Sequence, residues 1–187
     1  DTVVKGSTGR ALARTGKVAA PELLNILSSD DHSESIKGHA AWALAFMGAE
    51  AESFLLEALS SESSTVRAAV IGAIAKLLQE TPNDKSFQIL MDALDDPDEM
   101  IRCEAISSLG NLAYQPAVAK LVDLLGHAEA ETRKSAALAL MKMGDRTALE
   151  PLKAALDAEA DDALKPIFNL AVTQLDKKTA PDEDDWD

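Results

Sequence analysis

The sequence predicts an all-α fold, an α-solenoid of stacked helix pairs that repeats about every 31 residues. Three observations predict it: one motif recurs along the chain, its apolar residues have helical spacing, and turn-forming residues separate the copies. Each copy has a basic residue at its third position, at intervals of 32, 30, 35, 31 and 32 residues. These basic residues are Lys5, Lys37, Arg67, Arg102, Arg133 and Lys165.

Each of the six copies of the motif is expected to be a helix. They cover residues 3–16, 35–48, 65–78, 100–113, 131–144 and 163–176. A small residue follows the basic residue by six positions and a large apolar one by seven, as in Ala43 and Leu44. The positions three and ten after the basic residue complete a stripe of helical period. Its small residues indicate helices that pack closely.

A second, shorter helix is expected before each of the last five copies. These helices cover residues 21–27, 51–59, 87–94, 116–125 and 148–156. The longest interval contains QETPNDK, residues 79–85, which is predicted to be a loop because it holds Pro, Asn and Asp. The result is five helix pairs preceded by one unpaired helix, with no strand.

The repeats are expected to form one domain, residues 1–178. The chain opens inside a repeat, so we expect further N-terminal repeats to precede it, or another molecule to cover the apolar side of Val4 and Leu12. Residues 179–187 end in TAPDEDDWD and are expected to be a disordered acidic tail. Trp186 in this tail is either a short docking motif for a basic partner or part of a solvated segment.

Composition excludes several classes of protein. The 187 residues include 18 basic and 32 acidic side chains, and a net charge of -14 argues against binding to nucleic acid. A hydrophobic content of 47% is enough for a core, while one cysteine excludes a disulfide scaffold and fits a cytoplasmic protein. No apolar run approaches the roughly 18 residues of a membrane-spanning helix, so no membrane insertion is expected.

The pattern PxLxxxL, an acidic turn and V/I-R-xx-A-A-x-A-L-xx-M/L-G resembles the short HEAT-like repeat of the phycobilin lyase type. The segments TVVKGSTGRALARTG, KGHAAWALAFMGAEA, AVIGAIAKL, GNLAYQPAV and RKSAALALMKMGD are similar to cyanobacterial HEAT-repeat proteins. That group includes an IscA-binding HEAT protein and a phycobilisome-degradation protein. The resemblance implies stacked HEAT-like helix pairs and a protein partner, either an IscA-type iron-sulfur assembly protein or a phycobiliprotein. It also implies transient handling of a phycobilin.

The positions two, five and nine after the basic residue form a stripe roughly a third of a turn from the core stripe. These residues vary while the core stays regular, and we expect them on a concave face that binds a partner. The predicted partner-binding residues are His39, Trp42, Phe46, Arg10, Arg14, Lys76, Glu104 and Asn111.

Two groups within this stripe have alternative interpretations. Trp42, Phe46 and His39 are either an interface hot spot, since large rigid aromatics dominate binding energies, or residues that fill space between repeats. Arg10 and Arg14 lie in the one basic concentration of an acidic molecule. They either bind carboxylates of a bilin or of an acidic partner, or are ordinary charges on a helix surface.

The repeated basic residue is interpreted as structural, bridging to acidic turn residues of adjacent units. Asp30, Asp95 and Asp96 are the carboxylates proposed for that role.

No catalytic or metal-binding set is predicted. Cys103 follows Arg102 near an expected helix N-terminus, a setting that can lower a thiol pKa, but it stands alone. The histidines His32, His39 and His127 neither cluster in the sequence nor precede a Glu, as metal-binding pairs would.

The preferred hypothesis is a non-catalytic scaffold that binds a protein partner on its concave face. The alternative is a bilin lyase or lyase subunit, which would attach or detach a phycobilin chromophore. A lyase needs a pocket with converging polar groups, whereas the stripe contains small residues such as Ala69 and Gly72, and this favours the scaffold. A nucleic-acid-binding solenoid such as a DNA glycosylase is disfavoured by charge. The sequence leaves the oligomeric state open.

Overall fold

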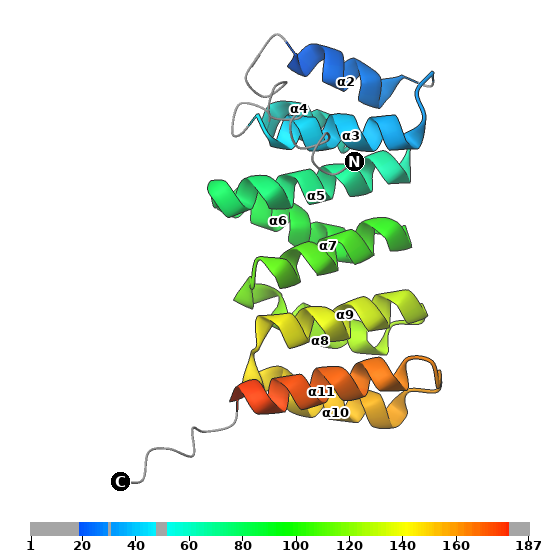
Figure 1. Cartoon of the computed structure of the whole chain (residues 1–187), viewed down its shortest axis with the longest axis vertical. Helices are drawn as coiled ribbons and strands as arrows, with labels where there is room; N and C mark the ends of the chain where they lie inside the picture. Colours follow the sequence, from blue (N-terminus) through cyan, green and yellow to red (C-terminus); the bar gives the residue numbers. More distant parts are fainter. Residues whose placement is uncertain (1–18, 30, 48–51, 180–187) are drawn as a thin grey trace. The chain divides into compact units, whose positions relative to one another are not determined.

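The computed structural model describes residues 19–29, 31–47 and 52–179, and every regular element in these ranges is a helix (Figure 1). The α-helices are α2 (Ala20–Ser28), α3 (Glu34–Ala45), α4 (Glu52–Ala58), α5 (Ser64–Glu80), α6 (Asp84–Asp92), α7 (Glu99–Asn111), α8 (Val118–Asp123), α9 (Ala130–Met143), α10 (Leu149–Ala158) and α11 (Lys165–Thr179). Short 3-10 turns adjoin some of them: η3 (Ala93–Asp95), η4 (Gln115–Ala117), η5 (Leu124–Gly126) and η6 (Arg146–Ala148). The all-α prediction is confirmed. The expected helix at 3–16, with Arg10 and Arg14, and residues 180–187 of the expected tail lie outside the described residues.

The predicted loop at residues 79–85 is shorter than expected. The helix α5 continues to Glu80, and α6 already begins at Asp84. Asn83 caps α6, because its side-chain oxygen accepts a hydrogen bond from the backbone N–H of Ser86 at 2.8 Å. The prediction was wrong at both ends because polar residues are equally suited to an exposed helix surface, and only the Pro and the capping Asn enforce a break.

The chain divides into two compact units, residues 1–108 and 109–187, here called the first unit and the second unit. The division falls within α7. In the first unit, α3 packs against α2 and α5, and α5 packs against α4 and α6. In the second unit, α9 packs against α8 and α11, and α11 packs against α10. One continuous domain over residues 1–178 stays a prediction.

The core stripe of the repeat lies inside both units, as the spacing predicts. In the five described copies, the small residues six positions after the basic residue are buried: Ala43, Ala73, Ser108, Ala139 and Ala171. Their size permits close approach of helices. A Cβ added to Gly110 of α7 would lie 2.8 Å from the Cβ of Ala139 on α9, so these helices meet almost backbone to backbone.

The repeated arginines close the turn before their own helix. In three repeats, the guanidinium donates to the backbone carbonyl oxygen six residues earlier: Arg67 to Ser61 at 2.8 Å, Arg102 to Asp96 at 2.7 Å, and Arg133 to His127 at 3.0 Å. A structural role is therefore confirmed for these three arginines, but the partners differ from those expected. Asp96 contributes its backbone carbonyl to Arg102, and the carboxylate that reaches across repeats is Glu159, bound to Arg133. Asp30 lies outside the described residues.

Within the described ranges, the helices are too short or too polar to cross a lipid bilayer.

Candidate functional site

An open groove of about 470 Å³ lies in the first unit, where residues of α3, α5 and α7 come together. Its lining is mostly apolar and includes Gly38, Trp42, Ala69, Gly72, Met100 and Glu104. The groove therefore joins Trp42 and Glu104, two of the predicted partner-binding residues from different repeats. Met100 also lines the groove and is one of the exposed large hydrophobic residues of the described chain, with an exposed fraction of 50%.

Trp42 of α3 and Phe46, the residue that follows this helix as its C-cap, form an aromatic pair beside the groove. The ring centroids of Trp42 and Phe46 are 4.2 Å apart, with an angle of 55° between the planes. The Nζ atom of Lys76 lies 5.9 Å from the Phe46 centroid and 3.5 Å from Oε1 of Glu80. Both rings are half-buried. This degree of burial is intermediate between that of an exposed interface hot spot and that of a residue filling the core. Each residue partly fills inter-helix space and partly faces outward.

His39 is also on α3 and is exposed, but the groove lining does not include it. Asn111, the last residue of α7, belongs to the second unit. There its side-chain oxygen accepts a hydrogen bond from Nζ of Lys142 on α9 at 2.9 Å. The predicted stripe therefore supplies residues both to the groove of the first unit and to a contact within the second unit.

The carboxyl group of Glu104 owes its position to Gly72. A Cβ on Gly72 would lie 2.7 Å from Oε1 of Glu104, so any larger residue on α5 would displace the carboxyl group. Burial raises the pKa of Glu104 above its ordinary value, and a side-chain hydrogen bond with Ser108 opposes this only partly. Glu104 therefore takes up a proton at a higher pH than an exposed glutamate does.

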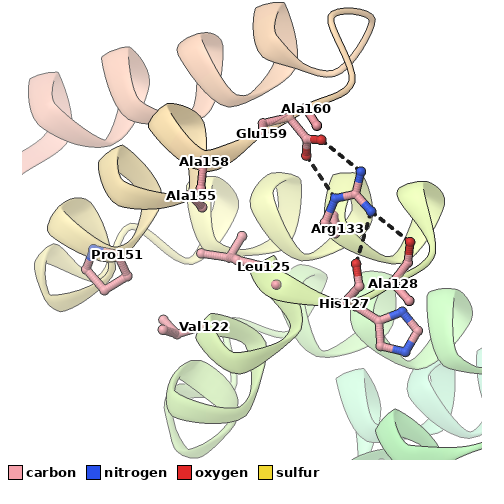
Figure 2. A pocket seen from close by; sticks show the side chains of 11 residues that line it. Val122, Leu125, His127, Ala128, Arg133, Pro151, Ala155, Ala158, Glu159 and Ala160 are labelled. Atoms are coloured by element: carbon pink, nitrogen blue, oxygen red, sulfur yellow. Dashed lines mark hydrogen bonds and ion pairs between the residues drawn. The ribbon is translucent and has the colours of Figure 1, made fainter.

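A second cavity of about 520 Å³ lies in the second unit (Figure 2). Apolar residues such as Val122, Leu125 and Pro151 form one part of its wall, and Arg133 with Glu159 forms another. Figure 2 shows the Arg133 side chain pointing toward the Glu159 carboxylate and toward the backbone of the preceding turn. Nε and Nη2 of Arg133 donate to the two carboxylate oxygens of Glu159, each at 2.8 Å.

The ion pair shifts both partners toward their charged forms. The hydrogen bonds from Arg133 hold the pKa of Glu159 below its usual range, and those to Glu159 raise the pKa of Arg133. The sequence analysis missed this cavity. The available signal was the acidic turn of the following repeat, whose Glu159 is 26 residues from the arginine and so escapes a local pattern.

His127 lines this second cavity, and its Nδ1 accepts a hydrogen bond from the backbone N–H of Glu129 at 3.1 Å. Cys103 is half-buried on α7. In the part of the chain that the structure describes, no three His, Cys, Asp or Glu residues are grouped so that they would hold a metal ion.

Comparison with known proteins relates the chain to bilin proteins. It is 32% identical over 160 residues to the bilin biosynthesis protein MpeU of Synechococcus sp. (strain WH8020). The match covers 85% of this chain and 54% of MpeU, so the chain spans about half the length of that relative.

Two solved structures show a similar fold. The complex of CpcE and CpcF of phycocyanin lyase from Nostoc sp. PCC7120 matches with a TM-score of 0.68 and 22% identity, covering 82% of this chain and 98% of that chain. A designed armadillo repeat protein in complex with the peptide (KR)4 matches with a TM-score of 0.54 and 21% identity, covering 90% of each chain.

The preferred hypothesis from the sequence, a non-catalytic scaffold for an iron-sulfur assembly factor or a phycobiliprotein, is wrong. The sequence relative is named for bilin biosynthesis, and it favours the alternative. Ala69 and Gly72 line the groove, so the small residues of the stripe do not argue against a pocket. Small residues were interpreted as an absence of binding features, whereas here the missing side chain of Gly72 makes room for the Glu104 carboxyl group in the groove wall.

The family itself is shown by the repeats. The model of HEAT repeats matches residues 1–75, 20–99 and 87–167, so the matches together extend over most of the chain. The helical pairs, the period and the buried stripe described above agree with these matches. The chain belongs to the HEAT-repeat family and is related in sequence to a bilin biosynthesis protein.

Proposed function

We propose that this chain is the HEAT-repeat part of a bilin lyase or lyase subunit, which attaches or detaches a phycobilin chromophore at a phycobiliprotein. The observation that carries the proposal is the 32% identity to a bilin biosynthesis protein over 85% of the chain. The chain spans about half the length of that relative. The role assigned to this chain is to bind and position the bilin.

The groove of the first unit supports this role by its chemistry. A phycobilin is an open-chain tetrapyrrole, a flat conjugated molecule with N–H groups along its length and two propionate side chains. Trp42 and Met100 offer apolar surface for the conjugated chain, and Glu104 offers a carboxyl group for the N–H groups. Lys76 on α5 lies near the aromatic pair but outside the groove lining, where it pairs with Glu80.

The proposed partners are a phycobiliprotein, which carries the acceptor cysteine, and a second lyase subunit. The second partner is proposed because the solved lyase of similar fold is a complex of two proteins, CpcE and CpcF.

Direct titration with phycocyanobilin tests the function. The chain should bind the pigment, and Trp42→Ala should weaken binding by about 2 kcal/mol, because a large rigid aromatic is lost from the site. Ile36→Ala is the matched control, since Ile36 lies on the same helix, is 46% exposed and is absent from the groove lining. Pigment binding should be unchanged in that control.

Transfer activity provides the second readout. The chain is expressed with its partner subunit, a phycobiliprotein and phycocyanobilin, and coloured phycobiliprotein is measured after denaturation, when only covalently attached pigment remains. Colour in the wild type, and less colour with Trp42→Ala, supports the proposal. A chain that neither binds phycocyanobilin alone nor promotes its attachment with the partner subunit contradicts it.

A further inference from the structure

Glu104 is the titratable side chain that the first-unit groove presents to a ligand. Among the described residues that line the groove on α3, α5 and α7, the others are glycine, alanine, tryptophan, threonine and methionine. The absence of a side chain on Gly72 leaves the space that the Glu104 carboxyl group occupies. The carboxyl group is thus built into the wall of the groove instead of extending freely into solvent.

The electrostatic surroundings do not favour a negative charge on Glu104. Its side-chain partner is the neutral hydroxyl of Ser108, and burial raises the pKa of the carboxyl group. The neighbouring charged and titratable groups are engaged or exposed. Lys76 on α5 pairs with Glu80, and His39 on α3 is exposed; neither lines the groove. A cationic ligand in contact with the carboxyl group would supply the missing compensation.

A bilin can become that cation. In its neutral form, three of its four nitrogens carry hydrogen and one is an imine nitrogen with a lone pair. We propose that the Glu104 carboxyl group, as a carboxylate, holds the bilin in the groove in the form that is protonated at this imine nitrogen. The imine nitrogen takes its proton from a hydronium ion of the solvent, so an O–H bond of hydronium breaks as the N–H bond of the bilin forms, and water is released. The Glu104 carboxylate then accepts hydrogen bonds from the ring N–H groups. This inference rests on the proposed function, because it assigns a residue to the binding of that substrate.

Protonation of a bilin changes its colour, which gives a readout that a merely structural role would not move. Phycocyanobilin is titrated into the chain, and the absorption of the bound pigment is recorded from pH 6 to 9, a range chosen to exceed the ordinary Glu pKa. The wild type should hold the red-shifted, protonated form to a higher pH than free pigment does. Glu104→Gln should bind about tenfold more weakly, since a charge-assisted hydrogen bond is lost, and should show the neutral spectrum.

Two further variants make the test specific. Glu99→Gln removes an exposed carboxylate from the same helix and should keep the wild-type spectrum. Gly72→Ala keeps Glu104 but places a methyl group where its carboxyl oxygen lies, so the spectrum should shift toward that of Glu104→Gln.

The outcomes separate the two proposals. If the wild type and Glu104→Gln both bind phycocyanobilin and give the same spectrum, the inference about Glu104 is overturned while the proposed function stands. If the wild type binds no phycocyanobilin, alone or with its partner subunit, the proposed function fails and the role of Glu104 fails with it. A spectrum that depends on Glu104 and on Gly72, but not on Glu99, supports the inference.

Discussion

Glu104 in the first unit and Glu159 in the second unit are two carboxyl groups beside cavities, and they differ in how the protein treats their charge. Glu159 accepts two hydrogen bonds from Arg133 and another from the backbone N–H of Asp161 at 3.0 Å. Its pKa is lowered, whereas the pKa of Glu104, which has the hydroxyl of Ser108 as side-chain partner, is raised. The protein therefore stabilises the negative charge of Glu159 and does not stabilise that of Glu104.

The comparison separates a structural carboxylate, Glu159, from Glu104, the one proposed to bind a ligand. The cavity of the second unit is the larger, about 520 Å³ against about 470 Å³, yet the strongest hydrogen-bonding groups in its wall already bind each other. The groove of the first unit is smaller but offers an exposed apolar edge and a carboxyl group with spare hydrogen-bonding capacity. The state of the polar groups, more than the volume, therefore identifies the candidate site.

The largest loss of stability is expected when the ion pair of the second unit is broken. Glu159→Ala leaves the Arg133 guanidinium, which is 17% exposed, without its carboxylate, and we expect a loss of about 3 kcal/mol in the free energy of unfolding. Urea denaturation followed by circular dichroism measures this. The control is Glu150→Ala, which removes an 80% exposed partner of Lys153 and should leave stability unchanged. Equal losses of stability in the two variants would show that the Arg133–Glu159 pair stabilises the fold no more than an exposed ion pair does.

A smaller effect on stability is expected from substitutions at two glycines, Gly110 on α7 and Gly72 on α5. Gly110→Ala places a methyl group 2.9 Å from the Cα atom of Ala139, and because backbone has to move, we expect a loss of about 2 kcal/mol. Gly72→Ala meets the flexible end of Glu104, which can turn away. Alanine is the better helix former, so this variant should be as stable as the wild type or more stable by up to about 1 kcal/mol. Thermal denaturation of both variants checks the contrast, and a comparable loss in Gly72→Ala would mean that the groove wall is rigid.

The smallest effect is the pH dependence of stability, which should have opposite signs for the two carboxyl groups. The raised pKa of Glu104 contributes stability below the ordinary Glu pKa, and that contribution is lost as pH rises through the folded-state pKa. The lowered pKa of Glu159 contributes stability above the ordinary value, and that contribution is lost as pH falls through the folded-state pKa. Relative to the wild type, Glu104→Gln should therefore gain stability with rising pH, and Glu159→Gln should lose it.

Urea denaturation of the wild type and the two glutamine variants between pH 3 and 8 measures these differences, since the range spans the ordinary Glu pKa. A difference between Glu104→Gln and wild type that does not vary with pH would remove the contrast drawn between the two regions.

The sequence predicted the helices well because apolar period and small-residue spacing are local properties. It placed the loop at 79–85 too widely, since polar residues alone do not end a helix. It selected Trp42 and Glu104 because both lie on the stripe that varies between repeats, but it misjudged Gly72. A glycine on a helix face permits close approach of a neighbouring helix, as at Gly110, or of a side chain, as at Gly72, and only the residue on the neighbouring helix decides between them. Glu159 escaped prediction for a similar reason, because its partner belongs to the preceding repeat.

The turn-closing arginines affect how such a protein can gain repeats by duplication. Arg67, Arg102 and Arg133 each bind a backbone oxygen only six residues earlier, so the contact is contained in the segment that encodes it. Because the acceptor is a backbone carbonyl, every amino acid at that position supplies it. A duplicated segment therefore contains both partners of this hydrogen bond, and no matching change is needed elsewhere in the chain. Repeats of this design can be added or lost as whole units while their exposed stripes diverge.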